Sequence, residues 1–556
     1  MQHEINSVQT EEHPMTNLFV RKATGLVRSW SVMDAFIYAF FSINLITLGL
    51  YSFSQMYYFE GGMINALILS ALFIFFEVVV YAALIAVMPR SGGDYVWQSR
   101  ILGGAVGFIL AVTGWWFILW LWVPLYGDMF RHIVLVPLLG VLGARDTALW
   151  FAGTQNGAFT ASLLTLAIVS FFIALGMKTY ARIQKFSFYG GMLGLLIIIV
   201  LLLAGSPEAF RAGLESNAVS LFNAQPGVYD ATVALGTDAG AITPFSGGAL
   251  LPIFLILPYM VFFNLWPNWG ATLYGEVRGA TDFKRNITGM GAALGVTTLL
   301  GILLLYAIGK TVGWDFYVQA GGAWWNYTWG FAPDAPPAMP FWPYPALFAA
   351  FLTTNRIVQF VVLALMSLWW FGWSGTVFLS STRVIFAAAF DRLLPEKVAE
   401  VDERTGTPIN ALLLMVVPSV IVAYLFAYNI ASFQTLTLCS TLVIAVTFLG
   451  TTIAAIVLPY TKPELYKASP IAKYNLLGIP LITVAGIIFG GFLVFLLYQW
   501  IIDPNLLYGI GYRNTNSIIY MLLNYVLAAA IYFGFKAYRK RGGIDMDKVQ
   551  AEIPVE

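Results

Sequence analysis

Twelve apolar stretches, each long enough to cross a lipid bilayer as a helix, occupy most of this chain of 556 residues. A helix needs roughly 20 apolar residues to cross the hydrocarbon core of a membrane. The stretches are 30–51, 64–88, 101–125, 158–177, 186–205, 252–278, 287–310, 355–390, 408–428, 432–460, 478–501 and 515–537. Because lipid offers no hydrogen bonds to the backbone, such segments must be helical. The sequence therefore predicts an all-α polytopic membrane protein with about 12 transmembrane helices.

Composition narrows the class of protein further. Hydrophobic residues make up 59% of the chain and aromatic residues 16%. The hydrophobic fraction is well above that of soluble domains. The net charge of +1 gives no reason to expect nucleic acid as a partner. A single cysteine, Cys439, excludes a disulfide within the chain. We find no metal-ligand spacing and no phosphate-binding loop, and we predict no enzyme activity, no metal and no cofactor.

Basic residues are distributed very unevenly between the two sides of the predicted membrane. The side with both termini and the loops after the second, fourth, sixth, eighth and tenth segments holds all but six of the 29 Lys and Arg residues. The six on the other side are Arg131, Arg145, Arg211, Lys310, Arg356 and Arg513. Since Lys and Arg accumulate on the cytoplasmic side, both termini are predicted to be cytoplasmic, in a multi-pass protein of the plasma membrane.

Three regions fall outside the twelve segments but are not simple turns. The stretch 126–144 is apolar but carries Asp128 and Arg131, so we expect an interfacial helix on the outer side. The connections 206–251 and 311–346 are rich in Gly, Pro, Trp and Asn and are predicted to be ordered extracellular loops.

Four stretches on the predicted cytoplasmic side resemble the amino acid–polyamine–organocation (APC) transporter superfamily. They are "MPRSGGDYVWQSRILGGAVGF" (88–108), "GMKTYARIQKF" (176–186), "GEVRGATDFKRNI" (275–287) and "STRVIFAAAFDRLLP…TGTP" (381–408). The first is similar to the family's Pro-x-Ser-Gly-Gly-x-Tyr loop, and the third has Ala280 where proline is usual. Four matches in the family's order identify the chain as an APC superfamily member that resembles the amino acid permeases.

The resemblance implies a fold of two inverted five-helix repeats with broken helices 1 and 6, followed by two extra helices. The expected divisions are a cytoplasmic segment 1–29, repeats over 30–205 and 252–460, extracellular loops 206–251 and 311–346, two helices in 461–540, and a cytoplasmic tail 541–556. A helix break exposes backbone N–H and C=O groups, which membrane proteins tolerate only where these line a cavity. The breaks are therefore the expected substrate site.

In helix 1, the family's Gly-x-Gly break binds a substrate carboxylate through backbone N–H groups. Here the same place reads "NLITLG", with only Gly49 nearby. Asn44 and Thr47, one turn apart, are candidate substrate-binding residues by this resemblance. The alternative is that both are ordinary polar packing residues of a membrane bundle.

Helix 6 contains "NLWPNWG" at the corresponding place. Pro267 breaks the helix by itself because it lacks an N–H and clashes with the preceding turn. Asn264 and Asn268 are the candidates to satisfy the freed groups or the substrate. Trp266 either walls or covers the site, or it packs against lipid.

The sequence leaves open whether Na⁺ or H⁺ drives transport. The Lys of proton-coupled relatives is missing, because its place in helix 5 falls at Gly190–Gly191. Ser374 and Thr376 lie at the depth where sodium-coupled members supply oxygens, but such hydroxyls also bond to a carbonyl one turn back. Glu77 lies in an apolar span. It either carries a proton or braces helix 2 as a neutral group.

A cytoplasmic gate is also implied by the resemblance. Transporters of this fold pair a basic residue before helix 1 with an acidic residue at the inner end of helix 8, here Arg28 and Asp391. Trp30 would pack beneath this pair. The alternative is that these charges only fix the topology.

We predict a secondary transporter that moves amino acids or related amines by alternating access, with a small-molecule substrate and the lipid bilayer as partners. The alternatives are a polyamine or organocation carrier, or a nutrient sensor or channel on the same fold. The two substrate-contacting breaks match the family least well, and the sequence carries no signal for an oligomeric state.

Overall fold

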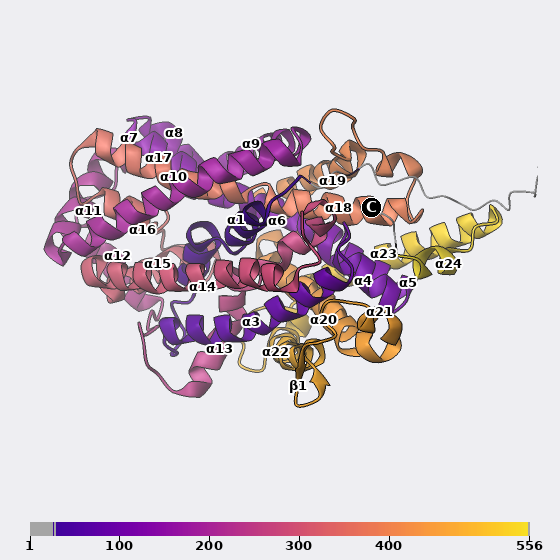
Figure 1. The fold of residues 1–556 in the computed structure, drawn as a ribbon. Coiled ribbons are helices and arrows are strands. Elements are labelled where there is room, and N and C mark those ends of the chain that lie inside the picture. Colours follow the sequence, from indigo (N-terminus) through magenta and orange to yellow (C-terminus); the bar gives the residue numbers. More distant parts are fainter. Residues whose placement is uncertain (1–25, 27–28, 554–556) are drawn as a thin grey trace, which may run out of the picture.

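The computed structural model describes residue 26 and residues 29–553, which form a bundle of long helices (Figure 1). Within these residues, 12 helical runs are long and apolar enough to cross a membrane. They are Val32–Gln55, Met63–Val87, Gly104–Val141, Gln155–Ala174, Met177–Ala204, Leu250–Glu276, Phe283–Thr328, Arg356–Phe390, Ile409–Ala427, Leu438–Thr461, Leu481–Ile502 and Thr515–Arg541. The predicted all-α polytopic fold is confirmed.

The surface of the bundle carries stripes of exposed apolar side chains. Along α10 (Met177–Ala204), Phe186, Tyr189, Leu193 and Leu196 recur every three or four residues and are more than half exposed. Soluble monomers rarely expose such a continuous apolar face, so these side chains face lipid.

The first and sixth membrane segments are both interrupted. The first consists of α1 (Val32–Ile43), the π-helical turn η1 (Leu45–Gly49) and α2 (Leu50–Gln55), and the sixth of α13 (Leu250–Asn264) and the 3-10 helix η5 (Pro267–Glu276). Asn44 interrupts the first with a φ of 42°, a value that few non-glycine residues adopt. Pro267 is the first residue of η5, a position where its missing N–H leaves no helical hydrogen bond unmade.

The third run continues further than the sequence predicts. It contains α5 (Gly104–Val112), η2 (Thr113–Phe117), η3 (Ile118–Leu121), α6 (Trp122–Phe130), η4 (Arg131–Leu135) and α7 (Val136–Val141). The stretch 126–144, predicted as a separate interfacial helix, is instead mostly the continuation of this helical run, and its interfacial position stays a prediction. Asp128 and Arg131 are three residues apart and pair at 2.5 Å, which lets both charges lie within it.

The two regions predicted to be long loops contain helices. They are α11 (Pro207–Phe222) and α12 (Val228–Asp238) in the first, and α15 (Trp314–Thr328) in the second. With α8 (Arg145–Gly153) and α16 (Pro345–Ala350), these helices cover one end of the bundle (Figure 1). Helix α15 continues α14 (Phe283–Ile308) and the turn η6 (Gly309–Gly313), and the chain bends at Gly313, whose φ is 85°.

The opposite end carries Arg90, Arg278, Arg392 and Lys467, and we call it the basic end.

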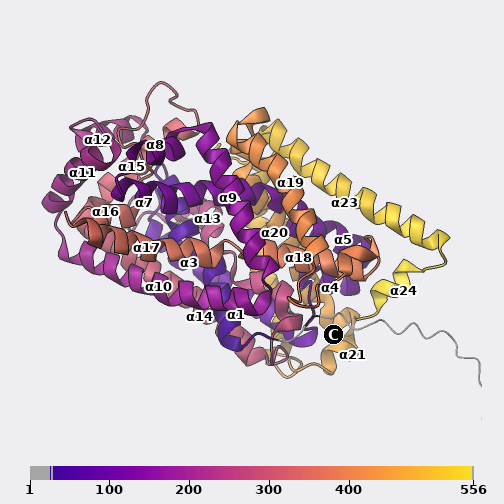
Figure 2. The same cartoon turned by 90° about the horizontal axis from the view of Figure 1, so that it is seen from above.

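The other elements are α3 (Met63–Val87), α4 (Asp94–Ile101), α9 (Gln155–Ala174), α17 (Arg356–Trp373), α18 (Thr376–Phe390), η7 (Glu396–Ala399), α19 (Ile409–Ala427), η8 (Ile430–Leu436), α20 (Thr437–Thr461), α21 (Pro463–Lys467), α22 (Leu481–Ile502), η9 (Gly511–Arg513), α23 (Thr515–Arg541), α24 (Met546–Ala551), and the antiparallel pair β1 (Asn475–Leu476) and β2 (Ile479–Pro480). Helix α23 runs along one side of the bundle, and α24 turns back toward α4 (Figure 2).

Candidate functional site

The break in the first segment is capped by the residue that causes it. The Asn44 Oδ1 accepts hydrogen bonds from the backbone N–H groups of Ile46 (3.1 Å) and Thr47 (2.9 Å). Its Nδ2 donates to the Trp369 carbonyl at 3.0 Å. The backbone N–H groups at the start of η1 are therefore satisfied by a side chain of the same segment.

The two interrupted segments touch at this level. Gly49 lies against the Phe263 ring, where a Cβ would come within 3.1 Å of the ring carbons. Asn264 accepts a hydrogen bond from Ser70 Oγ at 2.8 Å. The Thr47 hydroxyl and the Asn264 Nδ2 are buried and form no hydrogen bond with any residue that the structure describes. Gly49 of the first break thus packs beside the residue that precedes Asn264, and Thr47 and Asn264 keep hydrogen-bonding capacity.

Trp266 lies inside the protein, which excludes the alternative that it packs against lipid. Its indole N–H donates to the Phe262 carbonyl at 2.8 Å, and its ring packs edge-on against Trp122 and Trp269. Asn268, on the next turn, is also fully buried. The sixth-segment break is therefore walled by aromatic rings.

The eighth segment is interrupted as well, between α17 and α18. Ser374 Oγ donates to the Phe371 carbonyl at 3.3 Å, and Thr376 Oγ1 donates to the Trp373 carbonyl at 2.8 Å. Both hydroxyls thus form the local bonds to the preceding turn that membrane helices commonly use.

Two residues near this break were not predicted from the sequence. The Tyr38 hydroxyl donates to the Thr376 carbonyl at 2.7 Å and lies 2.7 Å from Ser380 Oγ. Ser380 in turn donates to the Trp269 carbonyl at 3.0 Å. These bonds link the first, sixth and eighth segments. The only sequence signal for Ser380 is its position one turn after Thr376.

Close packing of the first and eighth segments gives a testable expectation. A Cβ on Gly372 would lie 2.3 Å from the ring of the buried Phe41. Gly372→Ala is therefore expected to destabilise the protein by about 1–3 kcal/mol, as overpacking usually does. Thermal unfolding in detergent micelles measures the change. The control is Gly491→Ala in α22, where a Cβ meets nothing within 4 Å; equal melting temperatures for the two variants would contradict the expectation.

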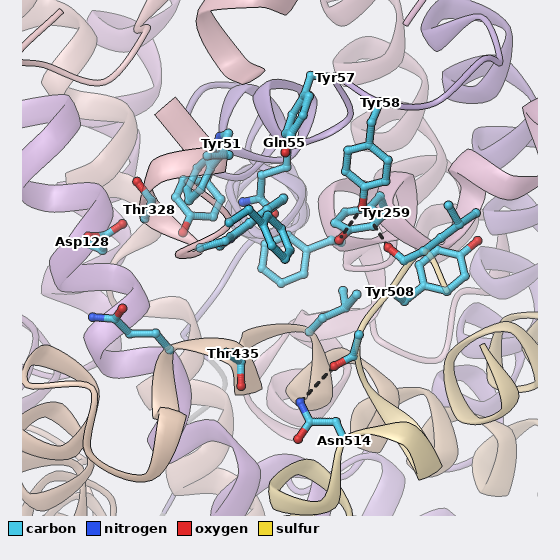
Figure 3. A pocket seen from close by; sticks show the side chains of 18 of the residues that line it. Tyr51, Gln55, Tyr57, Tyr58, Asp128, Tyr259, Thr328, Thr435, Tyr508 and Asn514 are labelled. Carbon is cyan, nitrogen blue, oxygen red and sulfur yellow. Dashed lines mark hydrogen bonds between the residues drawn. The ribbon is translucent and has the colours of Figure 1, made fainter. Parts of the chain in front are cut away.

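A vestibule of about 590 Å³ lies above the breaks, on the side away from the basic end. Figure 3 shows its polar and aromatic lining, which includes Tyr51, Gln55, Tyr58, Tyr259, Tyr508 and Asn514. The Tyr58 hydroxyl lies 3.1 Å from the Tyr259 hydroxyl and donates to the Leu507 carbonyl at 2.8 Å. Tyrosines of this kind combine a large apolar contact area with a hydrogen-bonding group.

The lining of the vestibule adjoins both breaks. Tyr51 comes from α2, directly after η1, and Phe262 comes from the last turn of α13. The ring of Phe262 packs against Trp122, and its carbonyl accepts the Trp266 indole. Only a layer of aromatic side chains therefore separates the vestibule from the sixth-segment break.

Two buried ion pairs join different segments at the basic end. Arg383 in α18 binds Glu276 through Nε–Oε1 (2.7 Å) and Nη2–Oε2 (3.2 Å). Arg100 in α4 binds Asp391 through Nη1–Oδ2 (2.5 Å) and Nη2–Oδ1 (2.9 Å). The predicted partner of Asp391, Arg28, lies outside the described residues. Asp391 is paired instead with Arg100, an arginine that the sequence did not indicate.

Trp30 also joins different segments at the basic end. Its backbone N–H donates to the Glu276 carbonyl at 3.2 Å, and its carbonyl accepts from the Arg278 N–H at 3.0 Å. Its buried indole donates to the Met177 carbonyl at 3.1 Å. The start of the first segment is thereby joined to the end of the sixth.

Comparison with known proteins bears on this arrangement. The family described as amino acid permease matches residues 34–531. A search of curated proteins finds no match to the chain. The family match covers all of the segments that form the vestibule, the breaks and the ion pairs. The chain is a multi-pass membrane protein that belongs to the amino acid permease family, whose members transport amino acids or related compounds.

Proposed function

We propose that this protein is a secondary active transporter that moves its substrate across the plasma membrane by alternating access. One observation supports the proposal: two interrupted segments meet below a vestibule whose lining residues Tyr51 and Phe262 adjoin their breaks. On the other side lie the buried pairs Arg383–Glu276 and Arg100–Asp391. Breaks with an aromatic layer and a vestibule on one side and ion pairs on the other fit alternating access, in which one side opens at a time.

The orientation follows from the distribution of basic residues. The basic end is the cytoplasmic side by the positive-inside rule. The vestibule then opens to the outside, and substrate that enters it from the exterior must displace the aromatic layer to reach the breaks. Transport requires the two ion pairs to separate.

The substrate class is an amino acid or a related amine, and the capping of η1 favours an amine without a free carboxylate. In a break that binds a carboxylate, the backbone N–H groups point to the ligand. Here the Ile46 and Thr47 N–H groups are already bound by Asn44. A carboxylate would have to displace the Asn44 side chain, which would cost its hydrogen bond to Trp369 as well.

Uptake by purified protein in proteoliposomes tests the proposal. A panel of labelled amino acids, their carboxyl-free amines and polyamines is supplied outside, with the unlabelled compound inside for counterflow. We expect saturable counterflow of at least one compound, and faster counterflow of amines than of the matching amino acids. Binding without counterflow would indicate a sensor, and unitary currents would indicate a channel; either would overturn the proposal.

A further inference from the structure

Two buried carboxyl groups lie together beside the sixth segment. Glu77 is on α3 and Asp94 is the first residue of α4, and both side chains are fully buried. The two are close enough for a charge on Asp94 to act on Glu77. Tyr81, one turn after Glu77 on α3, donates its hydroxyl hydrogen to Asp94 Oδ1 at 2.6 Å.

The two carboxyls differ in their hydrogen bonds. Asp94 Oδ1 also accepts from Thr451 Oγ1 at 2.5 Å, and Thr451 accepts from Gln98 Nε2 at 2.7 Å. Neither oxygen of Glu77 forms a hydrogen bond with any of the residues described. No described residue therefore serves as the partner through which a neutral Glu77 would brace α3.

No basic side chain in the described part of the chain lies within ion-pair distance of either carboxyl. Among the titratable groups on the elements packed around them, Tyr81 faces the pair. The charged groups are engaged or exposed: Arg100 and Asp391 pair, as do Arg383 and Glu276, while Lys284 and Arg285 are exposed. Of the other tyrosines, Tyr95 donates to Asp391, Tyr274 of η5 is buried, and Tyr460 and Tyr498 are exposed. An unpaired carboxylate in such a site costs several kcal/mol or more, and a bound proton removes that cost.

Burial raises the pKa of Asp94, which lies between two membrane-spanning runs, to about 6. This value is close to physiological pH, so Asp94 can gain and lose a proton there.

The pair is connected to a segment that transport must move. Asn268 of η5 lies next to the Tyr81 hydroxyl, and its amide forms no hydrogen bond of ordinary length and angle with the residues described. The loop before α4 is fastened to η5 as well, because the Gly92 N–H donates to the Thr272 carbonyl at 2.8 Å. A displacement of η5 would therefore change the surroundings of both carboxyls.

We propose that Glu77 and Asp94 form a proton-binding site which movement of η5 loads and unloads, so that transport is coupled to a proton gradient. This inference rests on the proposed function and adds the coupling ion to it. While η5 is in the position described here, the proton on Glu77 reduces the negative charge of the pair to that of Asp94 alone. Displacement of η5 toward an opened basic end exposes the pair to water and releases the proton.

Infrared spectroscopy of the purified full-length protein tests proton binding without any substrate. At neutral pH we expect the carbonyl stretch of a buried protonated carboxyl, which Glu77→Gln removes. Asp94→Asn should keep that band but lose a second one that grows as the pH falls through about 6. The control is Glu464→Gln, at an exposed surface position. An unchanged spectrum in Glu77→Gln would overturn the proposal.

Uptake of the best compound of the panel, with proton and sodium gradients imposed separately, tests coupling. We expect an inward proton gradient to stimulate wild-type uptake, and Glu77→Gln to lose the stimulation while it retains counterflow. Stimulation by sodium alone, or an equal proton response in the variant, would overturn the inference and leave the proposed function intact. If addition of methylammonium deprotonates Glu77, the carboxylate binds an amine and not a coupling proton. That result would also overturn the inference. Failure of all counterflow in the wild type would instead contradict the proposed function.

Discussion

Replacing Arg383 with methionine is expected to destabilise the protein by about 3–5 kcal/mol, the usual cost of removing one partner of a buried ion pair. Arg383 is fully buried, and it holds Glu276 with two hydrogen bonds. Without it the Glu276 carboxylate remains buried without its cation. The loss should be visible as a large fall in the melting temperature in detergent micelles, and as a loss of substrate counterflow, because η5 is no longer held against α18.

Two further variants make this expectation specific. The double variant Arg383→Met with Glu276→Leu removes both charges and should recover most of the stability, since apolar replacement of a buried pair is often neutral or stabilising. The exposed pair Arg211–Asp230 provides the control, because Arg211→Met should cost no more than about 1 kcal/mol. A double variant as unstable as the single one would contradict the ion-pair explanation.

Replacing Asn44 with alanine is expected to have the second largest effect. The change removes the acceptor of two backbone N–H groups and the donor to the Trp369 carbonyl, all of them buried. Each buried group left without a partner costs about 1–3 kcal/mol, so we expect a loss of several kcal/mol in thermal unfolding. The exposed N–H groups should also bind carboxylates, so added amino acids should raise the melting temperature of this variant more than that of the wild type.

A second asparagine, whose side chain accepts hydrogen bonds from the N–H groups two and three residues later, serves as the control. Asn355 caps α17 by accepting from Ile357 (3.0 Å) and Val358 (3.2 Å), but it is exposed. Asn355→Ala should cost only about 1 kcal/mol, as for an ordinary N-cap. Asn44→Asp keeps the acceptor and should recover part of the lost stability. Equal losses for the two alanine variants would show that burial of the Asn44 cap is unimportant.

The twelve spans and the sixth-segment break could be predicted because each depends on a local property. Hydrophobic length sets the spans, and the ring of Pro267 interrupts a helix wherever it occurs. The resemblance to the permeases located the break in the first segment, and there Asn44 supplies the interruption that glycines supply in relatives.

Other features depend on contacts that a single sequence does not reveal. The charges of Asp128 and Arg131 indicated the end of a span, but they neutralise each other within it. Asp391 was paired by resemblance with Arg28, and the Arg100–Asp391 pair depends on how α4 packs against α18. Asp94 reads as one more interfacial charge, because nothing local shows that folding brings it beside Glu77. Asp391 and Asp94 have their partners on a different segment. Asp128 and Arg131 are near each other in sequence, but only their burial shows that they pair inside the helical run.

The backbone hydrogen bonds at Trp30 have a mechanical consequence. They join the first and sixth segments to each other at the basic end, and because they are backbone bonds they do not depend on the identity of the side chains. If both bonds persist through the cycle, a tilt of either segment must carry the other with it. The breaks of the first and sixth segments then move as one rigid unit, and any hinge must lie in the helices that surround them.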